Sequence, residues 1–137
     1  MTLIRILVVD DSVRMRKAIC DVLRTVDACE IVGQTWNGLE AVELARALRP
    51  DLIVLDVHMP IMGGIDTLRR VKSELPQTNV VMVSSDLLPE VSDSASRLGA
   101  VACLEKGEAL SNGLLAVVAG MSSGPLARPD RLCGATP

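Results

Sequence analysis

Five short apolar runs, separated by segments of helical periodicity, constrain the fold of this chain more than any other feature. The runs cover residues 3–9, 30–34, 52–55, 80–83 and 100–105. Between them, apolar residues recur every three or four positions; in the first such segment they are Met15, Ala18, Ile19, Val22 and Leu23. A continuous apolar run such as residues 52–55 is typical of a parallel strand covered on both faces. We therefore predict an α/β fold, a doubly wound five-stranded parallel sheet with five helices and right-handed crossovers.

Gly and Pro residues mark the boundaries of the predicted helices. The second helix begins at Asn37-Gly38 and ends before Pro50, and the third follows Gly63-Gly64. The fourth, less regular helix ends at Gly99. We expect residues 1–121 to form a single domain, because 137 residues suffice for one core of ordinary size. Residues 122–137, rich in Pro, Gly and Ser, are predicted to be a disordered tail or the start of a linker.

The composition argues against binding to nucleic acids or membranes. The net charge is −3 at pH 7, so no positive field attracts a polyanion. No apolar stretch approaches the roughly 20 residues that span a bilayer, and residues 1–10 do not resemble a secretory signal. The four cysteines are scattered and are expected to be reduced thiols. We expect a cytoplasmic protein without direct contacts to nucleic acid or membrane.

Four of the five predicted strands end at a side chain that can bind a charged ligand. The first ends at Asp10 and Asp11, the third at Asp56, the fourth at Ser84 and the fifth at Lys106. In a flavodoxin-like sheet of order 2-1-3-4-5, the carboxyl ends of the strands meet at one edge, where ligands bind. Neighbouring strands lie about 4.8 Å apart, so the acids and the serine fall within one coordination sphere. Singly, each residue is an ordinary helix cap or loop residue; together they predict a site.

The predicted acidic cluster needs positive charge to be stable. A hard divalent cation such as Mg²⁺ takes carboxylate oxygens together with phosphate oxygens and water. With Mg²⁺ and the ammonium group of Lys106, three carboxylates are nearly neutralised, so the site can accept a phosphoryl dianion. The hydroxyl of Ser84 can then donate a hydrogen bond to a phosphoryl oxygen only when phosphate is present, an asymmetry on which a switch can be built.

At these residues the sequence resembles the receiver domain of bacterial two-component response regulators, over about residues 3–121. The matching segments are residues 7–12, Leu-Val-Val-Asp-Asp-Ser, and residues 56–64, Asp-Val-His-Met-Pro-Ile-Met-Gly-Gly. Residues 10–20, 55–70 and 80–85 look most similar to CheY-like receivers of chemotaxis methylesterases and of NarL-type regulators, which carry helix-turn-helix domains. Neither output domain fits into the residues after Met121, so we expect either a single-domain regulator or a receiver cut from a longer protein.

The resemblance implies a phosphoacceptor role in a phosphorelay. Asp56 would accept a phosphoryl group from the phosphohistidine of a sensor histidine kinase or a histidine phosphotransfer protein. Asp11 and Asp56, with the backbone carbonyl of His58, would hold Mg²⁺, and Asp10 would assist through a bound water. Such a domain is not an enzyme in the ordinary sense, because it only assists its own phosphorylation and dephosphorylation.

The resemblance also implies how the signal would leave the site. Ser84 and Lys106 would bind the phosphoryl oxygens, while His58 and Asp86 would modulate the lifetime of the phosphoryl group. The fourth helix, fifth strand and fifth helix would present the surface that binds a downstream protein, or a second copy in a homodimer. For His58, however, the favoured interpretation is an ordinary histidine of a surface loop. The basic residues Arg14, Arg16 and Lys17 could dock the phosphodonor, or could simply form a solvated helix face.

Three positions depart from the family pattern. Cys103 stands where most receivers have an aromatic residue whose rotamer follows phosphorylation, which puts the usual switch relay in doubt. Gly107 follows Lys106 where many members have proline, and Gly63 replaces a common aspartate.

Three rival functions use similar residues. An aspartyl-phosphate phosphohydrolase needs a second acid two positions after its nucleophile, where this chain has His58. A nucleotide or flavin binder of the flavodoxin type would show a Gly-rich phosphate loop and aromatic residues, and Trp36 is the only aromatic residue here. A receiver-like interaction module that is never phosphorylated would not need the complete set of acids.

Overall fold

Strands and helices alternate along the chain as predicted. The computed structural model describes residues 3–122. The strands are β1 (Ile4–Val9), β2 (Cys29–Thr35), β3 (Leu52–Asp56), β4 (Asn79–Ser84) and β5 (Ala102–Glu105). The helices are α1 (Val13–Leu23), α2 (Gly38–Leu48), α3 (Gly64–Glu74), α4 (Pro89–Arg97) and α5 (Leu110–Ser122). The prediction of a disordered tail concerns a segment that, beyond residue 122, lies outside the described residues.

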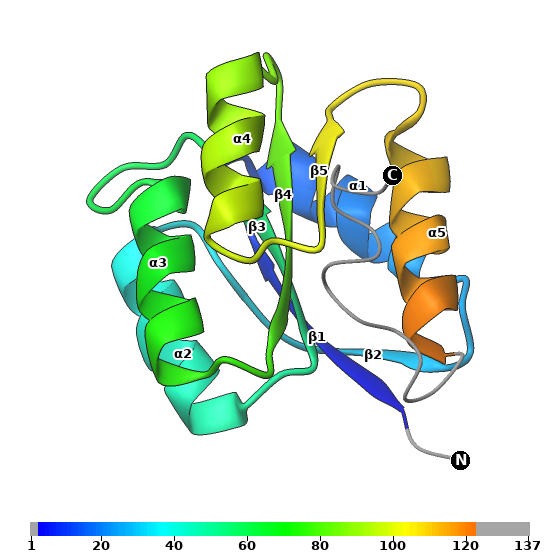
Figure 1. The fold of residues 1–137 in the computed structure, drawn as a ribbon. Helices are drawn as coiled ribbons and strands as arrows, with labels where there is room; N and C mark the ends of the chain where they lie inside the picture. The colour runs from blue at the N-terminus through cyan, green and yellow to red at the C-terminus, as the bar shows by residue number, and fades with distance from the viewer. Residues whose placement is uncertain (1–2, 123–137) are drawn as a thin grey trace.

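The five strands form one parallel sheet in the order β2-β1-β3-β4-β5, so the predicted strand order is confirmed. Helices α1 and α5 cover one face, and α2, α3 and α4 cover the other (Figure 1). The core is correspondingly divided into two clusters of aliphatic side chains, one on each side of the sheet. Every residue of β3 is buried, as its continuous apolar run requires. This central, two-sided burial holds the end of β3 rigidly between its neighbours.

Side-chain caps set where the first two helices begin. The hydroxyl of Ser12 accepts a hydrogen bond from the backbone N–H of Met15, which starts α1. Asn37 caps α2 in the same way, through the N–H of Glu40. The two aspartates that precede this cap each offer a carboxylate oxygen close to that of Asp56 at the end of β3. Ala18 was expected on the inner face of α1, but it is exposed, since this small residue lies at the border of the buried stripe.

Ile61, in the loop between β3 and α3, has an unfavourable backbone conformation. Its φ is +71°, in the left-handed region, which costs an L-residue about 1–2 kcal/mol and is rare for a β-branched side chain. The side chain is 69% exposed. No burial therefore offsets the strain, and the fold itself gives no reason for isoleucine at this position.

No helix within residues 3–122 combines the length and apolar character needed to cross a bilayer.

Candidate functional site

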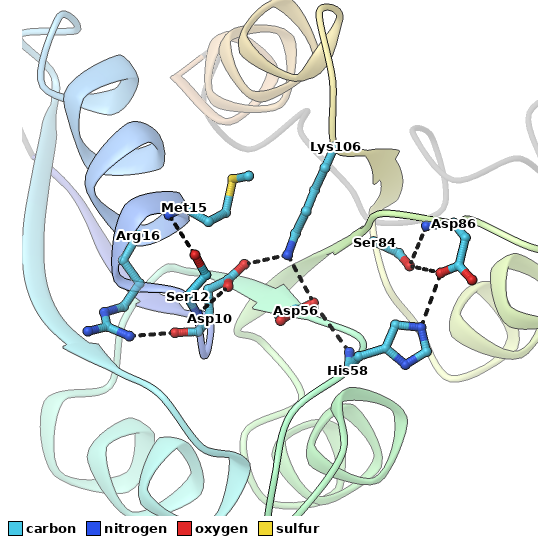
Figure 2. A network of polar contacts seen from close by, with 9 residues as sticks. All are labelled: Asp10, Ser12, Met15, Arg16, Asp56, His58, Ser84, Asp86 and Lys106. Carbon is cyan, nitrogen blue, oxygen red and sulfur yellow. Dashed lines mark hydrogen bonds and ion pairs between the residues drawn. The ribbon is translucent and has the colours of Figure 1, made fainter.

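The predicted site residues meet at the carboxyl edge of the sheet, the edge at which all five parallel strands end (Figure 2). Asp10 follows β1, Asp56 and Ser84 are the last residues of β3 and β4, and Lys106 follows β5. The backbone N–H of Lys106 donates to the carbonyl of Ser84 over 2.8 Å, which ties the ends of β4 and β5 together. The parallel arrangement thus brings together side chains that are up to 96 positions apart in the sequence, from 10 to 106.

Asp10 is the most constrained of the acids. Its Oδ1 accepts from the N–H of Ser12 at 2.9 Å, and its backbone carbonyl accepts from Arg16 Nη1 at 2.6 Å. Its backbone N–H donates to the carbonyl of Thr35 at 3.1 Å. Its other carboxylate oxygen, Oδ2, lies 3.0 Å from Lys106 Nζ but accepts no hydrogen bond of normal geometry from the described residues. A buried carboxylate oxygen in that position is suited to a further cationic ligand.

Asp56 lies at the end of the central strand, with 2% of its surface exposed. Its Oδ1 accepts from the N–H of His58 at 3.2 Å and lies 3.4 Å from Lys106 Nζ. Burial, followed by the negative charge of Asp10, raises the pKa of Asp56 to about 6, against the opposing effect of Lys106. Without a metal ion, the carboxylate of Asp56 is thus held in an environment that disfavours its charged form.

Lys106 is the cation that the described residues supply to this cluster. Its ammonium group lies between Asp10 and Asp56, with 15% of the side chain exposed. Burial alone would lower the pKa of Lys106, but its close ion pairs with the two aspartates outweigh this and raise the pKa. The lysine therefore stays charged and partly neutralises the acids.

Ser84 is fully buried and its hydroxyl is engaged by a residue of the following loop. Ser84 Oγ lies 3.4 Å from Asp86 Oδ1, and the N–H of Asp86 donates back to Oγ at 3.3 Å. The same Asp86 oxygen lies 3.3 Å from Nε2 of His58, whose side chain points towards it (Figure 2). Asp86 thus links the loop after β3 to the loop after β4.

The acids form a candidate divalent cation site. Asp10, Asp11 and Asp56 each offer a carboxylate oxygen, and these three oxygens lie within 4.8 Å of one another. Oxygen-only donors fit a hard cation such as Mg²⁺. The buried Oδ2 of Asp10 and the raised pKa of Asp56 are both consistent with a cluster that a cation would stabilise.

Gly64 allows α3 to begin directly against the end of β3. A Cβ atom at this position would lie 2.2 Å from the carbonyl oxygen of Asp56, a distance that no side chain can occupy. Its N–H donates to the carbonyl of Val57 at 2.8 Å. The absence of a side chain here therefore lets α3 lie directly against the backbone of Asp56 and Val57.

Two features of the site were not identified from the sequence. Arg16 was assigned to a basic outer face of α1, yet its guanidinium holds the backbone of Asp10. Asp86 was expected to act on phosphoryl lifetime, but its contact with Ser84 was not foreseen. Arg16 lies six positions after Asp10, across the start of α1, and Asp86 lies two positions after Ser84 in a loop. Neither spacing is a recognisable sequence signal.

The positions that depart from the family pattern have structural consequences of their own. Cys103 lies on β5, half-buried beside the cluster that packs α3 and α4 onto the sheet, so no aromatic ring is available there to swing. Gly107 has φ +153°, which proline cannot adopt because its ring holds φ near −65°. The loop after β5 therefore has a backbone conformation that receivers with proline at this position cannot adopt.

The fold and the site together define a doubly wound α/β protein with an acidic cluster, a lysine and a serine at the carboxyl edge of its sheet. The family model described as the response regulator receiver domain matches residues 6–118. The chain belongs to this family, whose members are the phosphoacceptors of two-component signalling, and both the expected family and the expected function are confirmed.

The similar proteins include members of both groups that the sequence indicated. Protein-glutamate methylesterase/protein-glutamine glutaminase 4 of Myxococcus xanthus is 42% identical over 105 residues, which are 75% of this chain and 30% of that protein. The response regulator domain of CheB from Thermotoga maritima is 34% identical, with a TM-score of 0.82, over 89% of this chain and 98% of that one. The signal receiver domain of NarL from Mycobacterium tuberculosis is 27% identical, also with a TM-score of 0.82, over 90% and 99% of the two chains. The chain spans less than a third of the length of the methylesterase relatives that it matches.

Proposed function

We propose that Asp56 accepts a phosphoryl group from a protein phosphohistidine and that residues 1–121 act as the receiver unit. The observation that carries this proposal is the convergence of three carboxylates, Lys106 and Ser84 at the carboxyl edge of the sheet in a member of the receiver family. The donor would be a sensor histidine kinase or a histidine phosphotransfer protein, and the exchange would take place in the cytoplasm. The chain would assist its own phosphorylation and dephosphorylation without being an enzyme in the ordinary sense.

The transfer exchanges one bond for another at phosphorus. A lone pair of an Asp56 carboxylate oxygen forms the new P–O bond, while the P–N bond of phosphohistidine breaks. The electron pair of that bond goes to the imidazole nitrogen, and the ring leaves neutral with a proton on its other nitrogen. The residues of this chain contribute position and charge, as in phosphoryl transfer generally.

Asp11 and Asp56, with the backbone carbonyl of His58, would hold Mg²⁺, and Asp10 would assist through water. The bound cation would supply positive charge to the transferring phosphoryl oxygens. Lys106 lies where its ammonium group can bind one of these oxygens once it leaves Asp10 or Asp56. The oxygen-only donor set, and the buried Oδ2 of Asp10 that only Lys106 contacts among the charged groups described, support this assignment.

Ser84 would convert phosphorylation into a conformational change. A serine hydroxyl has a single O–H donor, so it cannot donate to Asp86 and to a phosphoryl oxygen at once. When phosphate is present, Ser84 would release Asp86, and with it the contact between Asp86 and His58. The loop after β4 would then repack, and the α4–β5–α5 surface would bind a downstream protein or a second copy.

The direct test is phosphorylation by a small donor. With Mg²⁺ and phosphoramidate, intact mass spectrometry should show the addition of one phosphoryl group to the unmodified chain. Asp56→Ala should show none, and a chelator should abolish the addition. Asp66→Ala is the matched control, because Asp66 is an exposed aspartate on α3 that pairs only with Arg69 among the contacts seen here. A phosphoryl adduct that persists in Asp56→Ala would overturn the proposal.

A further inference from the structure

All four polar groups of Asp10 have a neighbour within hydrogen-bonding or ion-pair distance. Its backbone N–H donates to the carbonyl of Thr35, and its Oδ1 accepts from the N–H of Ser12 at 2.9 Å. Its Oδ2 lies 3.0 Å from Lys106 Nζ. Its backbone carbonyl, the remaining group, accepts from Nη1 of Arg16 at 2.6 Å. Because Asp10 is fully buried, bulk water does not reach these groups, and each depends on its protein partner.

The position of Arg16 is not explained by the stability of α1. The first turn of this helix contains no acidic residue, and Arg16 reaches back past the helix start to the carbonyl of Asp10. The helix dipole places positive charge at this end, so a cation is disfavoured there. Lys17 on the same helix pairs with Asp21. Within the described part of the chain no acid forms an ion pair with Arg16, which is half-buried. Its guanidinium instead contacts the backbone of Asp10.

The carbonyl that Arg16 binds belongs to the peptide group between Asp10 and Asp11. A peptide group is planar and rigid, so a contact that fixes its carbonyl also fixes the direction of the N–H of Asp11. Both aspartates offer a carboxylate oxygen to the acidic cluster, within 4.8 Å of that of Asp56. The hydrogen bond from Arg16 therefore restricts the backbone from which two of the three acids project.

The two cations beside Asp10 act on different parts of this residue. Arg16 and Lys106 lie on opposite sides of it, one at the backbone carbonyl and the other at the carboxylate (Figure 2). In the proposed function Lys106 turns to a phosphoryl oxygen and releases Asp10. The contact of Arg16 with the backbone does not compete with that step. Arg16 can therefore hold Asp10 in place while the carboxylate changes its partner.

We propose that Arg16 is a positioning residue of the cation site, which aims the carboxylates of Asp10 and Asp11 by fixing the peptide group between them. This inference rests on the cation site of the proposed function and extends it to a residue outside the acidic cluster. Arg16 touches neither the cation nor the phosphoryl group. Without it, the buried carbonyl of Asp10 loses its partner, and the peptide group turns to find another. Partners of this kind, one layer outside the ligands, typically contribute about tenfold or more to metal affinity.

The test measures Mg²⁺ affinity directly, without any phosphodonor. Mg²⁺ is titrated into the full chain, and the backbone amide signals of Asp11 and Ser12 are followed by two-dimensional NMR. Arg16→Met, which removes both the donor and the charge, should raise the Kd for Mg²⁺ about tenfold. Arg16→Lys, which keeps a charged donor on a side chain one atom shorter, should stay within about threefold of the unmodified protein. Arg14→Met is the matched control, because Arg14 is an exposed arginine on the same helix, and its Kd should be unchanged.

Two further readouts separate positioning from a general loss of structure. The carbonyl carbon signal of Asp10 should move in Arg16→Met, because the carbonyl loses its hydrogen bond, and it should return towards its original position in Arg16→Lys. In phosphorylation by phosphoramidate, Arg16→Met should need about tenfold more Mg²⁺ for half-maximal rate, with the rate at saturating Mg²⁺ kept within about threefold. A purely structural role would lower the saturated rate, leave the Mg²⁺ requirement unchanged and not be rescued by lysine, and that result would overturn the proposal.

The sign of the change decides between positioning and charge. Removal of a nearby positive charge alone would strengthen Mg²⁺ binding, so tighter binding by Arg16→Met overturns the proposal, as does an unchanged Kd. Should Arg16→Met not fold, Arg16→Gln, neutral and two atoms shorter than arginine, takes its place with the same expectations. Failure of phosphoramidate to modify the unmodified protein at any Mg²⁺ concentration refutes the proposed function alone, because the affinity for Mg²⁺ is measured without a donor. An unmodified protein that binds no Mg²⁺ refutes the cation site and this proposal with it.

Discussion

At the scale of single residues, the site is a balance of opposed charges. Asp56 is destabilised by burial and by Asp10, and it is stabilised by Lys106 and by the N–H of His58. The balance is incomplete, as the raised pKa of Asp56 shows. A site of this kind favours the arrival of a cation, since the cation relieves repulsion that is already present in the folded protein.

The first prediction concerns the pH dependence of stability without a divalent cation. Because the pKa of Asp56 is raised to about 6 on folding, the folded state binds its proton more tightly than the unfolded state does. Stability should therefore fall as the pH rises from about 4 through 6. Replacement of this carboxylate in Asp56→Asn should raise the free energy of unfolding by about 1–3 kcal/mol at pH 7.5, and by much less at pH 4.

Urea denaturation in the presence of a chelator at the two pH values measures this difference. Asp66→Asn is the control, since it removes only an exposed pair with Arg69. An Asp56→Asn variant that is less stable than the unmodified protein at pH 7.5 would contradict the electrostatic description of the site.

The second prediction uses Trp36 as a reporter of cation binding. Trp36 is the only aromatic residue in the chain, and it follows Thr35, whose carbonyl accepts from the N–H of Asp10. Binding of Mg²⁺ by the acidic cluster should shift this backbone and change the tryptophan emission in a saturable way. The change should be lost in Asp11→Ala, while Asp21→Ala, on the far part of α1, should retain it. An unmodified protein with emission insensitive to Mg²⁺ counts against the cation site.

At the scale of elements, the loop between β3 and α3 has the strictest backbone requirements. Gly63 and Gly64 are adjacent but have different roles. Gly63 is the N-cap of α3 with an ordinary extended backbone and no side-chain cap, whereas Gly64 lies against the carbonyl of Asp56. One glycine is therefore dispensable and the next is not.

The third prediction is that Gly63→Ser stabilises the protein and Gly64→Ala destabilises it. A serine at the first position can cap the helix and restricts the unfolded chain, which together should contribute about 0.5–1 kcal/mol. A methyl group at the second position must displace the backbone of Asp56, which should cost about 1–3 kcal/mol. Chemical denaturation measures both values, and phosphorylation by phosphoramidate should be impaired only in Gly64→Ala. Equal tolerance of both substitutions would show that α3 does not constrain the end of β3.

At the scale of the whole molecule, the loops after β3 and β4 are coupled across the site. Asp86 contacts both Ser84 and His58, so a change at the Ser84 hydroxyl affects both loops. From there β4 leads into α4, and β5 is tied to β4 through the N–H of Lys106. A local change in hydrogen bonding thus has a physical route to the α4–β5–α5 surface.

The fourth prediction is that beryllofluoride with Mg²⁺ shifts the backbone amide signals of residues 84–106. The phosphoryl mimic should draw the Ser84 hydroxyl away from Asp86 and release the loop after β4. In Ser84→Ala these shifts should shrink, whereas Ser73→Ala, an exposed serine on α3, should leave them unchanged. Two-dimensional NMR spectra measure the response, and unchanged amide shifts at residues 84–106 would falsify the switch.

The sequence by itself determined the order and type of the elements and the residues at the strand ends. Strand and helix periodicities are local signals, and Asp10, Asp11, Asp56, Ser84 and Lys106 each follow or end an apolar run that a reader of the sequence can recognise. Since parallel strands share one carboxyl edge, their convergence followed from the fold class. The resemblance to receivers indicated the roles of these residues in metal binding and phosphoryl transfer.

Only the tertiary structure decided how these residues interact. Lys106 lies between Asp10 and Asp56, Arg16 holds the carbonyl of Asp10, and Asp86 engages Ser84. The left-handed backbone of Ile61 likewise emerged only in three dimensions. The physical reason is that distances between distant segments, burial and the local electric field depend on packing, and no periodicity along the chain encodes them.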